Sequence, residues 1–262
     1  MSEINVIYQF NDKYVPYAGV SMTSLFINNI NASSLNVYIL GENLTEASRR
    51  LLRLTAEKYG RSIYFPKTEE MLKHFEQLGM ILYRGAFSVY LRLFFSEMID
   101  VRGKRVLYLD ADTIVNGSLQ SLFEYDLGGK SIVMVLESIR DNYKVMIGMG
   151  EDSDYYNSGV ILLDVDKWIA NRYCERLVEH IQNVRSSYIG DQDFLNNVCE
   201  GDVCRLPLIY NFQPLHARYS ASDYFKAYPS KASYGSDNNM VYSGYYSLEE
   251  IEAGKNSAVV YL

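Results

Sequence analysis

The sequence predicts an α/β protein with a mostly parallel central sheet flanked by helices. In roughly the first quarter of the chain, short apolar runs alternate with two helical patterns, which is typical of successive βαβ units with right-handed crossovers. The run Val106–Leu109 is a second indication, because its length and apolar content fit a buried strand. Further strands are expected at 131–136, in the later part of 154–164 and at 257–262.

The first elements follow from local signals. Strands are expected at 4–8, 35–40 and 62–65. Pro16 lies near the start of the first helix, in which apolar residues from Ala18 to Phe26 share one face. Thr45 is a suitable N-cap for the second helix, and Gly60 ends it. The polar residues 9–14 are expected to form the turn between the first strand and its helix.

Later elements are mostly helical. Helices are expected at 88–98, 118–124 and 168–184. Another helix opens after Gly190, where Asp191 is the expected N-cap. Residues 219–243 are rich in Tyr, Ser, Asn and Gly and are expected to form a long surface loop. Ser247 and Glu250 have the spacing of a capping box, which predicts a short helix that Gly254 ends.

The composition excludes several classes of protein. At 262 residues with 48% hydrophobic residues, the chain is expected to be a single domain spanning 1–262. A formal net charge of -7 argues against a nucleic-acid-binding protein. The chain shows no signal peptide and no apolar stretch long enough to cross a bilayer. Cys174, Cys199 and Cys204 lack CxxC spacing, which predicts reduced thiols in a cytoplasmic protein.

Two aspartates follow the predicted strand at 106–109. Only Ala111 separates Asp110 from Asp112, and ligands of open α/β sheets bind beyond the carboxyl ends of the strands. A bend at this point would let both carboxylates face one hard cation, and Mg²⁺ and Mn²⁺ both accept carboxylate and phosphate oxygens as ligands. A pair of solvated turn aspartates is the simpler interpretation, although few turns follow so apolar a strand.

Two enzyme families use this pattern. Glycosyltransferases of the GT-A fold have a metal-binding DxD after such a strand. Haloacid-dehalogenase-type phosphatases have DxDx(T/V), which Asp110 to Thr113 also match, and there Asp110 would be the nucleophile. That family normally places this strand first, whereas here about a hundred residues precede it, and Leu195 stands where a GDxxxD motif needs a carboxylate.

The turn at 9–14 argues against a dinucleotide-binding enzyme. It contains no glycine, so it lacks the phosphate-binding turn of a Rossmann dehydrogenase. Asn11 and Tyr14 instead offer an amide for hydrogen bonding and a ring for stacking a base. An ordinary polar turn would contain the same residue types.

Taken together, the motifs resemble those of family 8 glycosyltransferases, the galactosyl- and glucosyltransferase group that includes bacterial lipopolysaccharide enzymes and glycogenin. The resemblance covers nearly the whole chain, and its strength lies in the order and spacing of the motifs. They are Asn11–Tyr14, Tyr90–Leu93, Val106–Asp112, Tyr156–Val160, Asp191–Asp193 and Asn211–Pro214. The resemblance implies a GT-A fold, a UDP-sugar donor, Mn²⁺ (or Mg²⁺), retention of the anomeric configuration, and a saccharide or glycoconjugate acceptor.

The resemblance also assigns roles near the nucleotide. It implies that Asn11 and Tyr14 contact uracil, although the family often has Asp where Asn11 stands. Arg92 would be the cation that meets the donor sugar or its diphosphate. Asp110 and Asp112 would be the metal ligands, with Asp110 also near the ribose, and Ala111 between them belongs to the same donor-binding set.

For the sugar, the resemblance implies contacts from Asn157 and Ser158, whose simpler interpretation is a turn that satisfies its own hydrogen bonds. Asp191 would bind sugar hydroxyl groups, and Gln192 would lie beneath the anomeric carbon. Because a carboxamide is a poor nucleophile, a front-face mechanism is expected, in which the leaving phosphate takes the acceptor's proton. Asp191, Gln192 and Arg92 are therefore the predicted catalytic residues.

The end of the sequence leaves a third alternative, a catalytically silent sugar-nucleotide-binding module. The family usually continues with HxxGxxKPW, whose His is a third metal ligand and whose Lys meets the diphosphate. Tyr261 stands where that His is expected. The sequence is therefore expected to lack the family's C-terminal tail, which would also carry any peripheral association with a membrane.

Overall fold

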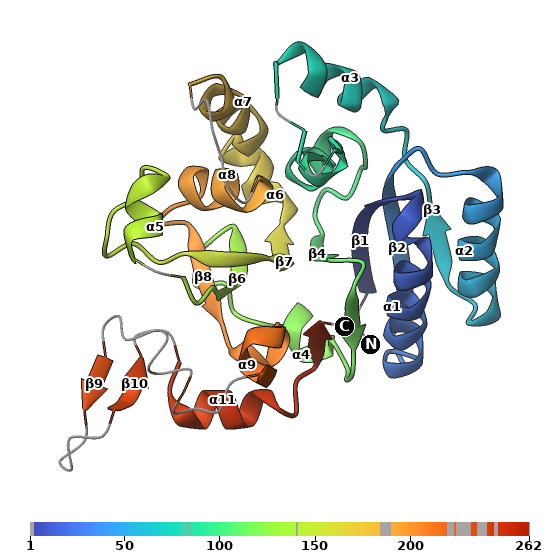
Figure 1. The fold of residues 1–262 in the computed structure, drawn as a ribbon. Helices are drawn as coiled ribbons and strands as arrows, with labels where there is room; N and C mark the ends of the chain where they lie inside the picture. Colours follow the sequence, from blue (N-terminus) through green and yellow to red (C-terminus); the bar gives the residue numbers. More distant parts are fainter. Residues whose placement is uncertain are drawn as a thin grey trace.

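The computed structural model describes residues 3–80, 82–83, 85–139, 141–183, 190–218, 223, 232–234, 240–243 and 246–261. Among these, seven strands form a central sheet in the order β3-β2-β1-β4-β7-β6-β8 (Figure 1). The strands are β1 (Glu3–Asn11), β2 (Ser34–Glu42), β3 (Ser62–Tyr64), β4 (Arg105–Leu109), β6 (Ile132–Leu136), β7 (Tyr156–Asp164) and β8 (Val203–Leu206). Only β7 runs antiparallel to its neighbours, so the predicted mostly parallel sheet is confirmed.

The first half of the sheet forms as predicted, with helices α1 (Val15–Asn28) and α2 (Glu46–Lys58) packed beside β1, β2 and β3 (Figure 1). The Thr45 hydroxyl accepts a hydrogen bond from the backbone N–H of Ser48, which confirms the N-cap. The predicted turn at 9–14 is wrong in its first part. Residues 9–11 continue β1 because they pair with 40–42 of β2, and a short 3₁₀ helix, η1 (Asp12–Tyr14), follows.

The helix expected at 88–98 is instead a 3₁₀ helix, η2 (Ser88–Glu97), with non-helical torsion angles at Phe94. Side chains on every side of η2 are buried, so packing from all directions decides its geometry. After β4 come the short strand β5 (Thr113–Val115) and the helices α4 (Gln120–Phe123) and α5 (Asp141–Met146). Strand β5 pairs antiparallel with β11 (Val259–Tyr261), which forms where a final strand was predicted.

The stretch 168–184, which was predicted to be largely helical, is helical but interrupted. Two helices, α6 (Val165–Ala170) and α7 (Tyr173–Asn183), meet at Arg172, which has a positive φ of 53°. The break brings the rings of Trp168 and Tyr173 to 4.6 Å between centroids, and both rings are buried. Helix α8 (Asp191–Val198) then packs between α7 and β7.

The last part of the chain contains more regular structure than expected. After η3 (Leu208–Tyr210) and α9 (Pro214–Arg218), the predicted loop at 219–243 contains an antiparallel pair, β9 (Ala232–Tyr234) and β10 (Met240–Ser243). The rest of that loop, apart from residue 223, lies outside the described residues. The predicted capping box opens α11 (Leu248–Gly254), so that prediction is confirmed, and Cys174, Cys199 and Cys204 form no disulfide in the described structure.

The junction between α1 and α4 makes a testable prediction. The buried Asn29 side chain accepts a hydrogen bond from Leu119 N–H at 2.7 Å and donates to the Leu25 carbonyl at 3.0 Å. Asn29→Ala leaves a buried N–H without a partner, which should cost about 1–3 kcal/mol in the free energy of unfolding. Urea unfolding monitored by circular dichroism measures this cost.

The neighbouring Asn28 provides the matched control. It also donates to main-chain carbonyls, but its side chain is exposed, so water can replace the lost bonds. Asn28→Ala should therefore cost less than about 1 kcal/mol. An equal loss in both variants would contradict the account of this junction.

Candidate functional site

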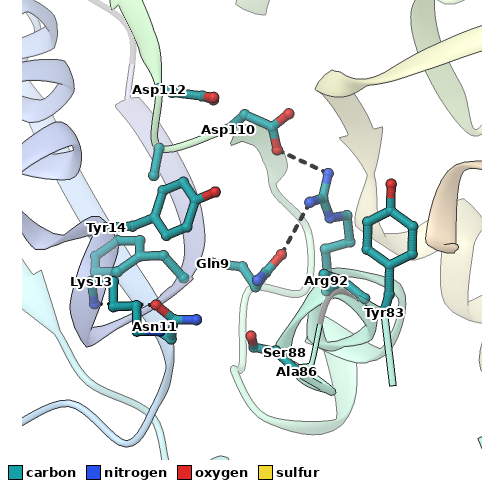
Figure 2. Close-up of a pocket in the computed structure, with 13 residues that line it drawn as sticks. Gln9, Asn11, Lys13, Tyr14, Tyr83, Ala86, Ser88, Arg92, Asp110 and Asp112 are labelled. Atoms are coloured by element: carbon teal, nitrogen blue, oxygen red, sulfur yellow. Dashed lines mark hydrogen bonds and ion pairs between the residues drawn. The ribbon is translucent and has the colours of Figure 1, made fainter. Parts of the chain in front are cut away.

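A pocket of about 320 Å³ lies at the carboxyl ends of β1 and β4. Figure 2 shows Asn11, Lys13 and Tyr14 on one side of it and Arg92 on the other, with Asp110 and Asp112 above. The volume lies at the lower end of the range for small-molecule sites, and the position is the one expected for ligands of open α/β sheets. The structure therefore brings into one pocket six residues proposed from the sequence: Asn11, Tyr14, Arg92, Asp110, Ala111 and Asp112.

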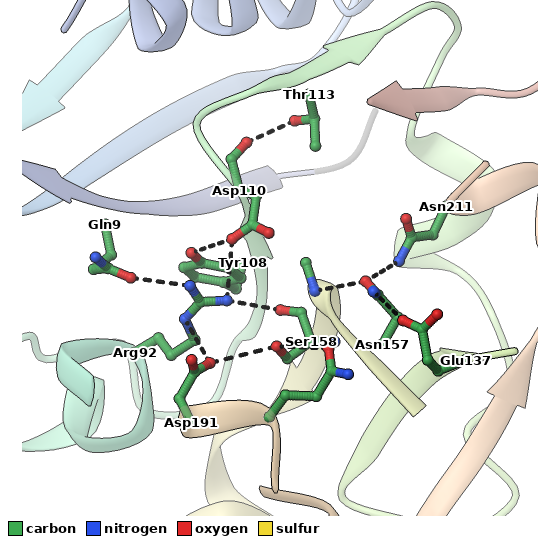
Figure 3. A network of polar contacts seen from close by, with 12 residues as sticks. Gln9, Arg92, Tyr108, Asp110, Thr113, Glu137, Asn157, Ser158, Asp191 and Asn211 are labelled. Carbon is green, nitrogen blue, oxygen red and sulfur yellow. Dashed lines mark hydrogen bonds and ion pairs between the residues drawn. The ribbon is translucent and has the colours of Figure 1, made fainter. Parts of the chain in front are cut away.

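Arg92 is the centre of the polar network at the floor of this pocket (Figure 3). Its Nη1 lies 3.0 Å from Asp110 Oδ1 and donates to the Ser158 carbonyl at 2.9 Å. Its Nη2 donates to Gln9 Oε1 at 3.0 Å, and its Nε lies 3.2 Å from Asp191 Oδ2. The side chain is only 9% exposed, so these partners compensate for most of its lost hydration.

The guanidinium plane also lies 4.1 Å from the centre of the Tyr108 ring. The Tyr108 hydroxyl donates to Asp110 Oδ1 at 2.7 Å, so this one carboxylate oxygen receives both a phenol and the arginine. The cation–π contact and the shared acceptor fix the direction of the Asp110 side chain.

Asp112 lies beside Asp110 in a different environment. Partial burial and the neighbouring negative charge of Asp110 raise the pKa of the Asp112 carboxyl. No described Lys or Arg forms a salt bridge with Asp112. A carboxylate that has no cationic side chain as a salt-bridge partner is well suited to bind a divalent cation. The described residues contain no cluster of three or more His, Cys, Asp or Glu side chains that could hold a metal by themselves.

The turn after β1 is held by hydrogen bonds at its start and is exposed at Tyr14. Asn11 Oδ1 accepts from Lys13 N–H at 3.1 Å, and Asp12 Oδ1 accepts from Thr45 N–H at 2.9 Å, which ties the turn to the start of α2. Tyr14 is 41% exposed and its ring lies 5.8 Å from that of Tyr17. The turn thus holds an aromatic ring at the pocket edge where a planar ligand could stack on it.

Asn157 and Ser158 lie inside β7, so the polar turn predicted there is wrong. The pairing of β6 with β7 shifts register between Met134 and Val135, which leaves residues 158–160 as an irregularity in the strand. The Asn157 side chain donates to Glu137 Oε2 at 2.6 Å and accepts from Gly159 N–H and Asn211 Nδ2. Neither residue lines the pocket, and both lie on the β7 side of Arg92 (Figure 3).

Asp191 begins α8 but does not cap it, so this part of the prediction is wrong. The N-cap is Gly190, with φ at 58° and an added Cβ position only 3.2 Å from the Tyr83 ring, so glycine is required there. The Asp191 carboxylate instead faces Arg92 and Ser158 Oγ. Burial raises the pKa of Asp191 to about 6, with Arg92 opposing the rise and Asp110 adding to it.

Gln192 is buried one residue further along α8. Its Oε1 accepts from Ser158 N–H at 2.9 Å, and its Nε2 donates to the Tyr155 hydroxyl at 3.2 Å. Gln192, Asp191, Asn157 and Ser158 therefore form a second group next to the pocket, joined to the first group through Arg92. The roles assigned to these residues by resemblance stay predictions.

The sequence analysis missed three residues of this network. Gln9 was placed in a turn, although its side chain is buried and bonds to Arg92. Tyr108 was treated only as part of an apolar strand. Glu137 accepts from Asn157, and burial raises its pKa to about 7 against the opposing hydrogen bonds of Asn157 and Gln192. A carboxylate directly after the apolar run at 132–136 was the available signal, as it was for Asp110.

Comparison with known proteins agrees with the resemblance seen in the motifs. The model of glycosyl transferase family 8 matches residues 5–233. The chain belongs to this family. It is 26% identical to the lipopolysaccharide 1,2-glucosyltransferase of Escherichia coli K12 over 79% of its own length and 62% of that enzyme's. It is also 26% identical to glycosyltransferase GlyB of Streptococcus pneumoniae, of which it spans 48%.

Solved structures show the same fold. The galactosyltransferase LgtC, in complex with donor and acceptor sugar analogs, superposes with a TM-score of 0.75 at 23% identity, over 98% of this family 8 chain and 86% of LgtC. The bifunctional glycosyltransferase WbbM gives 0.74 at 20% identity, over 99% of this chain and 45% of WbbM. The chain thus has the predicted GT-A fold, and family membership removes the phosphatase alternative. None of the helices in the described part of the chain has both the length and the apolar character needed to cross a bilayer.

The raised pKa of Asp191 predicts a pH-dependent stability. The folded state binds the proton at about pH 6, against an ordinary carboxyl value of 3.8. Protonation therefore stabilises the fold, and the free energy of unfolding should fall as pH rises through this interval, by on the order of 3 kcal/mol from this group. Asp191→Asn should flatten that part of the profile, measured by urea unfolding between about pH 4 and pH 8.

Asp100→Asn is the control, because that side chain is 83% exposed. It should leave the pH profile as in the parent protein. A profile for Asp191→Asn as steep as that of the parent would show that the Asp191 proton does not affect stability.

Proposed function

We propose that this chain is a retaining hexosyltransferase that moves galactose or glucose from a UDP-sugar to a saccharide or glycoconjugate acceptor, with Mn²⁺ or Mg²⁺. The supporting observation is a single pocket that joins an exposed aromatic turn to a buried arginine and two adjacent carboxylates. These three features fit a base, a diphosphate and a divalent cation in that order. The E. coli relative named for lipopolysaccharide glucosyl transfer supports the choice of sugar and acceptor class.

The base would lie against the turn after β1. The Tyr14 ring is exposed for stacking, and no described residue accepts a hydrogen bond from Asn11 Nδ2, so this amide can donate to a uracil carbonyl. A different base would present another pattern of hydrogen-bond donors and acceptors to the Asn11 amide. The turn therefore supports a preference for uracil.

Asp110 and Asp112 would hold the metal ion, which supplies positive charge to the diphosphate. The fit rests on the donor set, because the two carboxylates line the same pocket and no described Lys or Arg forms a salt bridge with Asp112. Two carboxylates are few ligands for such an ion, so diphosphate oxygens and water would complete its coordination.

The residues of the chain would act on the donor as it breaks. The C1–O bond to the diphosphate lengthens, positive charge grows on the sugar ring and negative charge on UDP. The guanidinium of Arg92, which is only 9% exposed, would face this developing negative charge. Gln192 is a carboxamide and a poor nucleophile, so the acceptor oxygen would bond to C1 on the face that UDP leaves, while a phosphate oxygen takes the acceptor's proton.

Nucleotide choice tests the assignment of the turn. UDP with Mn²⁺ should raise the melting temperature by on the order of 5 °C at a concentration 100 times its Kd, because it binds only the folded state. GDP and NAD should shift it much less at the same concentrations. Differential scanning fluorimetry measures all three, and equal shifts would contradict a uracil site.

The metal assignment is tested by Asp112→Asn, which keeps the size of the side chain but removes its charge. We expect Mn²⁺-dependent hydrolysis of UDP-galactose or UDP-glucose to fall by about 10²-fold or more, with the melting temperature retained. The exposed Asp100→Asn again serves as control. Tight UDP binding without any turnover in the parent protein would instead favour the catalytically silent module.

A further inference from the structure

Helix α8 starts with three buried polar residues that point to three different sets of partners. Asp191, Gln192 and Asp193 are 5%, 6% and 2% exposed. Asp191 faces Arg92, and Gln192 lies between Ser158 and Tyr155. The proposed function uses Gln192, and the resemblance assigns Asp191 to the sugar hydroxyl groups, which leaves Asp193 without a role. A buried carboxylate is costly unless it is well hydrogen-bonded, so its partners show what it does.

Asp193 is held by two phenols. The Tyr155 hydroxyl donates to Asp193 Oδ1 at 2.6 Å, and the Tyr143 hydroxyl lies 2.9 and 3.0 Å from its two oxygens. Burial and the negative charge of Asp193 raise the pKa of both tyrosines, so each phenol keeps its proton. Tyr155 is the member that continues to Gln192, because its oxygen accepts from Gln192 Nε2 at 3.2 Å.

Donor and acceptor can be assigned in only one way in the hydrogen bonds of Tyr155 and Gln192. An ionised carboxylate only accepts, so the Tyr155 proton must point to Asp193 and the phenol oxygen must accept from Gln192. At the opposite end of the amide, Ser158 N–H only donates, so Gln192 Oε1 must face it. The amide nitrogen therefore meets an acceptor, the Tyr155 oxygen, and the amide oxygen meets donors of Ser158.

We propose that Tyr155 and Asp193 are positioning residues that fix which way the Gln192 carboxamide faces, so that its oxygen is turned to the Ser158 and Arg92 side of the site. This inference rests on the proposed function, in which positive charge grows on the donor sugar next to Gln192. A carbonyl oxygen stabilises such charge, whereas a flipped amide would present N–H groups of the wrong sign. Tyr155 and Asp193 act through Gln192 and touch no substrate.

The chain offers a matched pair of variants. Tyr155→Phe removes the hydroxyl that joins Asp193 to Gln192. Tyr143→Phe removes a hydroxyl from the same carboxylate, and among the described residues no hydrogen bond joins Tyr143 to Gln192. Both changes delete one phenol oxygen beside Asp193. Only the first should release the amide.

Kinetics provide the first measurement, with UDP-sugar and Mn²⁺. Tyr155→Phe should lower kcat by about 10- to 100-fold with the donor KM changed less than about two-fold, because the ground-state contacts of the nucleotide are untouched. Tyr143→Phe should stay within about two-fold of the parent in both parameters. Asp193→Asn should resemble Tyr155→Phe. The double variant of Tyr155→Phe and Asp193→Asn should lose no more of kcat than the worse of these two single variants. Equal losses in the two tyrosine variants, or additive losses in the double variant, would overturn the proposal.

The second measurement does not depend on activity. In protein labelled with ¹⁵N-glutamine, the signal of the Gln192 side-chain amide is assigned by its disappearance in Gln192→Glu. That signal should shift and exchange faster with solvent in Tyr155→Phe and Asp193→Asn, and remain in place in Tyr143→Phe. An unchanged signal in the first two variants would overturn the positioning role. If this pattern holds but the parent protein neither binds UDP nor turns over a UDP-sugar, the proposed function is wrong, whereas Tyr155 and Asp193 still orient the Gln192 amide.

Discussion

The buried guanidinium of Arg92 is the interaction on which the site depends. It joins β1 through Gln9, the end of β4 through Asp110, β7 through the Ser158 carbonyl and α8 through Asp191. Each element reaches the same point from a different part of the chain, so one side chain sets their spacing. Removing it would leave Asp110 and the buried Asp191 without their shared cation.

The carboxyl groups around Arg92 outnumber its single positive charge. Asp110, Asp112 and Asp191 are three carboxyl groups near one arginine. Burial raises the pKa values of Asp112 and Asp191, and the negative charge of Asp110 adds to the rise in both. The proposed divalent cation would offset this excess of negative charge, and a diphosphate would bind with it.

Sequence reasoning found the parts of the site that local patterns specify. Asp110 and Asp112 follow an apolar strand directly, and Asn11 and Tyr14 lie at the end of β1 and in the 3₁₀ helix after it, so neighbouring residues in the sequence give each pair its place. Arg92, Ser158 and Asp191 were assigned by resemblance, since the contact between Arg92 and Ser158 spans 66 residues of sequence. Asp191 was mistaken for a helix cap because capping residues and buried ligands share the same side-chain chemistry. Asp193 appeared only as the last residue of the Asp191–Asp193 motif, and Tyr155 gave no local signal, because the hydrogen bond between them spans 38 residues of sequence.

A crystal grown with UDP and Mn²⁺ tests the central claim most directly, by locating the ion from its anomalous scattering. The account predicts one strong manganese peak between the carboxylates of Asp110 and Asp112, with diphosphate oxygens completing its coordination and the uracil ring against Tyr14. It also predicts that Arg92 keeps its contact with Asp191. A manganese peak away from the two aspartates, or a nucleotide bound outside the pocket after β1, would contradict it.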